Sequence, residues 1–221
     1  MRMRKKKNLQ SRLLECYNLS VLNVEDKNFD SREGSAVIDT KALFGNDRPV
    51  ELEIGCGKGQ FVCELAQKHP ERNYLAVERS ANVLVTACER AMESGLGNVH
   101  FLCTNAEYLP RFISNGSISR IYLNFSCPFP KNSYANHRLT APRFLSIYRE
   151  LMADGAEIHQ KTDNMHFFEY SIEQFTACGF ALKNVSLDLH RSDFADKIVT
   201  EYEHRFASQG LPIYRLEAYI K

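Results

Sequence analysis

The sequence has little net charge and no run of apolar residues long enough to cross a membrane. Its 221 residues carry a formal net charge of only +1, and 44% of them are hydrophobic. Because a spanning helix needs about 20 consecutive apolar residues, we expect no membrane partner. The balanced charge also predicts that any contact with nucleic acid depends on local patches of basic residues rather than on the charge of the whole protein.

The cysteines lack the spacing of a metal site or a disulfide framework. All seven are scattered along the chain and none forms a C-x-x-C pair. This favours free thiols in a reducing compartment and predicts no bound metal. The basic N-terminus is not followed by the apolar segment of a secretory leader. We therefore expect a cytoplasmic protein.

One stretch, residues 50–61, organises the rest of the chain. Its sequence VELEIGCGKGQF reads as a buried strand, a turn built on Gly55, Gly57 and Gly59, and the start of a helix. Glycine lets a ligand approach the backbone closely, and the helix N-terminus behind the turn offers free N–H groups. In α/β proteins this is where nucleotides bind.

Two common nucleotide motifs are absent from this turn. Its glycines are spaced G-x-G-x-G rather than G-x-G-x-x-G, and Lys58 lacks the context of a phosphate-binding loop. Instead, Glu53 precedes the turn, and Glu78 follows Gly59 by 19 residues, about where a carboxylate reaches ribose hydroxyls. An acid before the turn suits a cationic ligand, so the pattern predicts S-adenosylmethionine. The alternative is a tight structural turn followed by a surface glutamate.

From residue 50 onward the pattern alternates strands and helices. We expect strands at 50–54, 73–77, 98–103, 119–125, 155–161, 180–187 and 212–219, and helices at 59–69, 80–94, 106–113, 141–152 and 164–178. This alternation predicts an α/β fold with a mostly parallel, seven-stranded sheet and helices on both faces. We expect a single domain over residues 1–221, with a basic N-terminal extension of about residues 1–45. The cluster Arg2–Lys7 is either a solvated tail or a contact to phosphates.

Ligands of such sheets gather where the parallel strands end. We expect one crevice lined by residues 53–59, Glu78, 104–107, 124–131 and 162–164. Asn105 in this crevice either addresses adenine or caps the following helix. The run 123–131 carries two prolines that fix its direction, which suits a loop with a reacting group. An ordinary proline-rich loop is the alternative.

These motifs resemble the bacterial tRNA (guanine-N7-)-methyltransferases over nearly the whole chain. The resemblance rests on EIGCGKG at 53–59, IYLNF at 121–125, P-x-P-K at 128–131, RLT at 138–140, KTDN at 161–164, LDLH at 187–190 and TEYE at 200–203. The glycine motif alone marks only a class I methyltransferase, whereas the later motifs in this order are far more specific. The resemblance implies a Rossmann-like class I fold, S-adenosylmethionine as cofactor, tRNA as partner and methylation of guanine N7, in a monomer or homodimer.

The resemblance also implies roles for individual positions. The implied cofactor-binding residues are Glu53, Gly55, Gly57, Gly59, Glu78, Asn105, Ala106 and Cys127, and the family usually has Asp at the position of Asn105. The implied substrate-binding residues are Lys131, Arg138, Asp163, Thr200, Glu201, Tyr202 and Glu203. Asp163 also fits a helix N-cap, and Thr200–Glu203 also fits a capping box, so both roles remain open.

The expected catalytic loop departs from the family pattern, which is a Pro-Asp-Pro-Trp-type motif. Cys127 stands at the position of the catalytic aspartate and Phe129 at the position of the tryptophan. The loop behind them is usually strongly basic and here keeps Arg138 and His137. We therefore expect methyl transfer to be weak or conditional, with cofactor binding intact.

The chemistry of N7 methylation can be derived without the family. N7 carries a lone pair and no proton, so the reaction needs in-line placement rather than a strong base. The methylated ring is cationic, so a nearby carboxylate stabilises it. Asp163 and Glu203 are the candidates to accept hydrogen bonds from N1–H and the exocyclic amine. Two alternatives remain: a methyltransferase of small molecules or proteins, and a non-catalytic homologue that binds cofactor or RNA.

Overall fold

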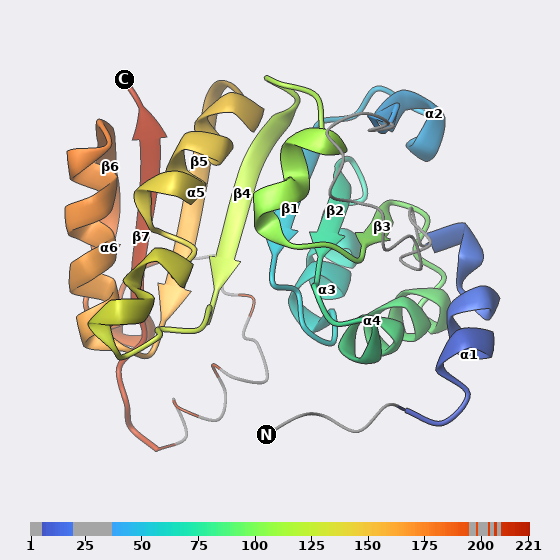
Figure 1. Ribbon diagram of the computed structural model, residues 1–221, viewed down its shortest axis with the longest axis horizontal. Coiled ribbons are helices and arrows are strands. Elements are labelled where there is room, and N and C mark those ends of the chain that lie inside the picture. The colour runs from blue at the N-terminus through green and yellow to red at the C-terminus, as the bar shows by residue number, and fades with distance from the viewer. Residues whose placement is uncertain (1–5, 20–36, 195–197, 199–202, 204–205, 207–208) are drawn as a thin grey trace. The chain divides into compact units, whose positions relative to one another are not determined.

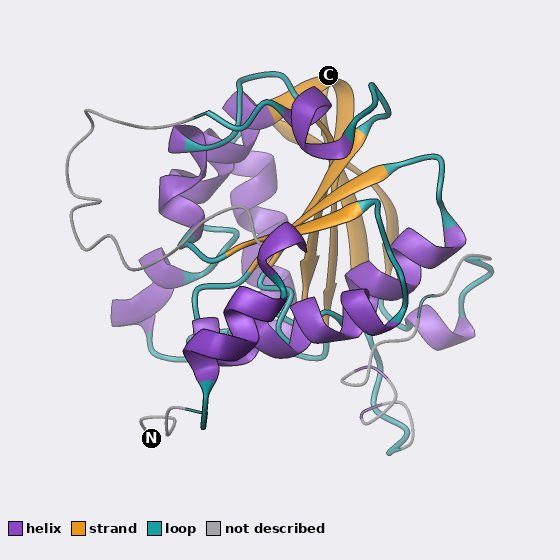
Figure 2. Ribbon diagram, turned by 90° about the vertical axis from the view of Figure 1, so that its right-hand side faces the viewer, coloured by secondary structure: helices purple, strands orange, loops and turns teal. Residues whose placement is uncertain are grey.

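The computed structural model describes residues 6–19, 37–194, 198, 203, 206 and 209–221. The chain forms two compact units, Met1–Phe112 and Ile113–Lys221, which Figure 1 labels by element and Figure 2 colours by secondary structure. The single-domain organisation stays a prediction. Among the described residues, no helix has both the length and the apolar character needed to cross a membrane.

The first unit is built on three parallel strands in the order β3-β2-β1. The strands are β1 (Val50–Ile54), β2 (Asn73–Val77) and β3 (Val99–Leu102). The helices are α1 (Leu9–Glu15), η1 (Tyr17–Leu19), α2 (Thr40–Phe44), α3 (Gln60–Lys68), α4 (Ala81–Glu93) and η2 (Ala106–Arg111). Every residue of the three strands is buried. The strands therefore present only their ends to a ligand.

The second unit mixes parallel and antiparallel pairing. Its strands follow the order β4-β5-β7-β6, and β7 runs antiparallel to both of its neighbours while β4 and β5 are parallel. The strands are β4 (Ile118–Asn124), β5 (Met152–Thr162), β6 (Phe180–Ser186) and β7 (Tyr214–Ile220). The helices are η3 (Asn132–His137), α5 (Pro142–Leu151), α6 (Met165–Ala177) and η4 (Leu189–Arg191). Helix α6 packs on β6 and its neighbours (Figure 1).

The expected α/β class with a seven-stranded, mostly parallel sheet is confirmed. The expected helix at 106–113 is instead the 3₁₀ helix η2, which contains Pro110. Proline has no N–H to donate, so it favours a short, tighter helix. Strand β5 begins three residues earlier than expected, directly after α5. Where β5 starts early, its pairing with β4 is irregular, and Gly155 in this stretch has a φ of 75°.

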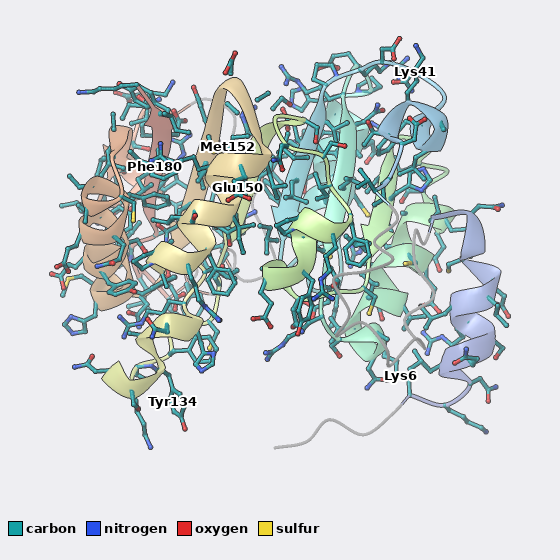
Figure 3. The ribbon with its side chains drawn as sticks, turned by 45° about the horizontal axis from the view of Figure 1, so that its top comes forward. Lys6, Lys41, Tyr134, Glu150, Met152 and Phe180 are labelled. Atoms are coloured by element: carbon teal, nitrogen blue, oxygen red, sulfur yellow. The ribbon has the colours of Figure 1, made fainter. Side chains whose placement is uncertain are left out.

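The described part of the basic N-terminal segment is held against α4. The backbone N–H of Lys6 donates to Asn82 Oδ1 at 2.6 Å, and Lys6 is labelled in Figure 3. Arg12 donates through Nε and Nη2 to both carboxylate oxygens of Glu89, at 2.6 and 2.7 Å. Residues 1–5 lie outside the described residues, so a contact of this cluster with phosphates stays a prediction.

Candidate active site

The glycine turn is tied to the end of β2, next to Glu78. The backbone N–H groups of Gly55 and Cys56 both donate to the carbonyl of Val77, at 2.7 and 3.0 Å. Gly55 and Gly57 have φ values of 82° and 58°, which favour glycine because it has no Cβ. A Cβ built on either would meet no atom of the described structure within 4 Å. The turn therefore leaves space beside its backbone.

Gly59 is required because helix α3 packs closely against helix α4. It precedes α3 as its N-cap, with a φ of 75°. A Cβ at this position would lie 2.6 Å from the Cβ of Ala87 on α4, closer than such atoms approach one another. Any larger residue would force α3 away from α4. Gly59 therefore allows the close packing that positions the N-terminus of α3 at the site.

Two carboxylates lie at the ends of the buried strands β1 and β2. Glu53 is only 4% exposed and Glu78 is half-buried. Burial raises the pKa of the Cys56 thiol well above its ordinary value, and the carboxylates of Glu53 and Glu78 raise it further. The pKa of Cys103 is raised to about 11, chiefly by burial and also by Glu78. Both thiols are therefore neutral at pH 7, and the parallel pairing of β1 with β2 brings the two carboxylates to the same edge of the sheet.

Glu78 and Asn105 both keep polar atoms available to a ligand. Glu78 Oε1 accepts a hydrogen bond from the backbone N–H of Ser80 at 2.9 Å, and the bonds of the described residues leave Oε2 to a ligand. Asn105 is exposed and occupies the N-cap position of η2, but its side chain makes no capping hydrogen bond. The amide of Asn105 is thus available for cofactor contact. Ala106, the first residue of η2, is buried beside it.

This donor and acceptor set fits S-adenosylmethionine, which is a cationic nucleoside. Glu53 and Glu78 supply negative charge and hydrogen-bond acceptors for an ammonium group and for hydroxyls. The open side of Gly55 and Gly57 lets a ligand approach the main chain. The individual contacts of these residues with the cofactor stay predictions.

Replacing Glu78 by alanine should weaken the binding of S-adenosylmethionine or its demethylated product by about tenfold or more. The variant loses a charge-assisted hydrogen bond, which contributes about 1.5–3 kcal/mol. Titration calorimetry measures the affinity, and Glu93→Ala, which removes an exposed glutamate at the end of α4, is the matched control. Equal affinity in wild type and Glu78→Ala would remove Glu78 from the site.

The loop after β4 is held in a strained conformation by one arginine. Phe125 and Phe129 have φ values of 48° and 41°, which cost bulky residues about 1–3 kcal/mol each. Arg138 donates through Nε to the carbonyl of Pro128 at 2.9 Å and through Nη2 to that of Phe129 at 3.0 Å. Its guanidinium carbon lies 4.3 Å from the centroid of the Tyr170 ring. Arg138 is 8% exposed, so its contacts face the loop.

Cys127 lies in this strained loop, and its side chain is exposed. Lys131, at the end of the loop, is also exposed. The hydroxyl of the neighbouring Ser126 is buried and has no hydrogen-bond partner among the described residues. Ser126 lies within the expected crevice, although the sequence indicated no role for it. The expected crevice combines this loop with the glycine turn of the other unit, and it stays a prediction.

Asp163 does not cap α6. The N-cap is Asn164, whose Oδ1 accepts a hydrogen bond from the Phe167 backbone N–H at 2.8 Å. The capping alternative for Asp163 is therefore wrong. Asp163 is half-buried at the end of β5, and the described residues provide no ion pair for its carboxylate. Its role in substrate binding stays a prediction.

Glu203 lies in a buried cluster that the sequence did not indicate. Its side chain is completely buried, and Oε2 accepts a hydrogen bond from Lys161 Nζ at 3.1 Å. The other oxygen lies 3.5 Å from His190 Nε2. Thr200, Glu201 and Tyr202 lie outside the described residues, and so does the capping box that was the alternative for this segment. The candidate role of Glu203 in holding guanine stays a prediction, with Lys161 already paired to it.

Comparison with known proteins gives consistent results in sequence and in structure. A family model described as "Putative methyltransferase" matches residues 47–216. The tRNA (guanine-N(7)-)-methyltransferase of Listeria monocytogenes serotype 4b (strain F2365) is 44% identical over 99% of this chain and 98% of that protein. The protein of the same name from Geobacillus kaustophilus (strain HTA426) is 47% identical over 80% of this chain and 82% of its own length.

Solved structures share the fold at much lower identity. The 16S rRNA methyltransferase KamB superposes with a TM-score of 0.64 at 17% identity, covering 84% of this chain and 95% of that one. The aminoglycoside resistance methyltransferase NpmB1 gives a TM-score of 0.59 at 18% identity, with coverage of 84% and 95%. These likenesses show the fold alone. Because the family model matches most of the chain and the Listeria relative is 44% identical over 99% of it, the chain belongs to the tRNA (guanine-N7-)-methyltransferase family.

Proposed function

We propose that this protein methylates N7 of a guanine in tRNA, with S-adenosylmethionine as the methyl donor. The observation that carries the proposal is the position of Glu53 and Glu78 at the ends of the paired strands β1 and β2, beside the open glycine turn. It occurs in a chain that is 44% identical, over 99% of its length, to a relative named for this reaction. The cofactor supplies an electrophilic methyl group when it is bound. A tRNA substrate supports a cytoplasmic activity as part of this proposal.

The protein's own residues then bind the cofactor, orient the guanine and stabilise the positive charge that forms on it. Glu53 and Glu78 supply the negative charge that holds a cationic cofactor. Asp163, half-buried and not used as a cap, accepts hydrogen bonds from the donors of the guanine ring. N7 needs no base because it carries no proton, so proximity and orientation contribute most of the rate. The ring becomes cationic, and carboxylates nearby stabilise that charge.

A transfer assay tests the proposal directly. Purified protein is incubated with methyl-labelled S-adenosylmethionine and unmodified tRNA, and the labelled base is mapped by cleavage at N7-methylguanosine. We expect label in tRNA at guanine N7. Label in protein or small molecules without tRNA would support the rival methyltransferase class. Cofactor binding without transfer to any acceptor would support a non-catalytic homologue, which Cys127 keeps as the second candidate.

Replacing Asp163 by asparagine should abolish most of the transfer activity while Tm barely moves. The change removes a negative charge and two acceptor sites but preserves the size of the side chain. Asn164→Ala is the matched control. It removes the cap of α6 and should lower stability by about 1 kcal/mol, with a smaller loss of activity. If Asp163→Asn lowers Tm as much as Asn164→Ala does and activity falls in parallel, Asp163 is structural.

A further inference from the structure

Three aromatic rings gather at the end of the Arg138-bound loop. The centroid of the His137 ring lies 5.7 Å from that of Phe129 and 5.9 Å from that of Tyr134, with the ring planes tilted by 42° and 50°. Tyr134 is 48% exposed, His137 is exposed and Phe129 is half-buried. Figure 3 shows Tyr134 at the outer end of this segment. The rings therefore present a surface to the surroundings rather than a core.

The backbone holds one of these rings at an energetic cost. Phe129 has a φ of 41°, in the left-handed region. Its carbonyl accepts a hydrogen bond from the buried Arg138. Strained positions of this kind persist only where the surroundings enforce them, and they gather at functional sites. The Phe129 end of the cluster is therefore held in place.

The charge of the segment that carries the rings indicates the kind of partner. In the sequence, residues 108–149 contain no aspartate or glutamate but six arginines and lysines, of which Arg138 is buried against the loop. Lys131, three residues before Tyr134, is exposed. Exposed rings beside cations are how proteins recognise unpaired nucleotides, because the rings stack on bases and the cations pair with phosphates. A folded protein partner would not require this excess of positive charge.

We propose that Tyr134 and His137, supported by Phe129, form a platform that stacks on an unpaired base of the tRNA, with Lys131 contacting the adjacent phosphate. The inference rests on the proposed function and extends it, because it names a base-stacking site apart from the residues that hold the target guanine. The platform supplies affinity and register through ring contact. Lys131 supplies the part of the affinity that depends on salt.

Fluorescence and affinity measurements test the platform. Unmodified tRNA carrying 2-aminopurine at unpaired positions is titrated with protein. Wild type should quench one of these positions by stacking, and Tyr134→Ala should lose the quenching and bind tRNA about tenfold more weakly. Tyr134→Phe, which keeps the ring, should retain both. Met92→Ala removes a comparably exposed side chain from α4 and serves as the control for nonspecific loss.

Salt titration separates the two contributions. Lys131→Ala should reduce the slope of log affinity against log salt by about 0.7–0.9, whereas Tyr134→Ala should leave the slope unchanged. Unchanged affinity and quenching in Tyr134→Ala would overturn the platform even though tRNA is methylated. Equal losses in Tyr134→Phe and Tyr134→Ala would also overturn it, because the hydroxyl rather than the ring would then be responsible. Absence of both tRNA binding and methylation in wild type would contradict the proposed function itself.

Discussion

Replacing Arg138 by alanine should lower kcat for methyl transfer by roughly a hundredfold, with no change in the salt dependence of tRNA binding. The side chain bridges the carbonyls of Pro128 and Phe129, and the loop between β4 and η3 carries strained backbone at Phe129. Without the bridge the loop relaxes to other conformations, and the backbone and side chains that it sets against the substrate move with it. A displacement of about 1 Å from the reacting geometry costs about 10²-fold in rate.

Two further variants and a salt titration identify the role of Arg138. Arg138→Lys keeps the charge but cannot reproduce a planar fork, so it should restore only part of kcat. Arg143→Ala removes an exposed arginine from the same acid-free segment and should leave kcat unchanged. A phosphate contact would appear as a slope of log affinity against log salt that is smaller by about 0.9. If Arg138→Ala shows that smaller slope while kcat is retained, Arg138 binds tRNA and does not position the loop.

The fully buried strands were predictable from the sequence because they are short apolar runs between clear breaks. The expected bounds of β1 and β2 agree with the structure to the residue. Helix α1 was not expected, because it depends on α4: the pairing of Arg12 with Glu89 joins residues 77 positions apart. The start of β5 was missed for a similar reason, since it rests on an irregular pairing with β4 around Gly155. Local patterns cannot report contacts of this range.

In the candidate site, too, features set by local sequence were predictable and features set by distant contacts were not. Glu53, the glycine turn and Glu78 were predictable because they follow consecutive strands at fixed distances along the chain. The sequence could not show whether Asp163 or Asn164 caps α6, because Thr162, Asp163 and Asn164 all have side chains that can cap a helix. The sequence also could not indicate that Arg138 turns inward to the loop. That orientation depends on Tyr170, which lies 32 residues further along the chain and packs against the guanidinium.

Replacing Cys127 by aspartate should raise the rate of methyl transfer to guanine N7 by roughly tenfold. Guanine becomes cationic as N7 is methylated, and a neutral thiol stabilises that charge less than a carboxylate does. Cys127 is exposed in a loop whose backbone is fixed by Arg138, so an aspartate fits at this position without disturbing a packed core. The position already has aspartate in the family pattern that the chain resembles. The affinity for S-adenosylmethionine should change little.

Serine and asparagine at position 127 separate charge from thiol chemistry. Cys127→Ser keeps a small polar side chain and should leave the wild-type rate nearly unchanged. Cys127→Asn has the shape of aspartate without its charge, so it should not reproduce the gain of Cys127→Asp. Single-turnover transfer to unmodified tRNA measures the chemical step for each variant, and calorimetry checks that the cofactor still binds. If Cys127→Ser abolishes transfer and Cys127→Asp fails to restore it, the sulfur itself takes part in the reaction, and an electrostatic role for this position is wrong.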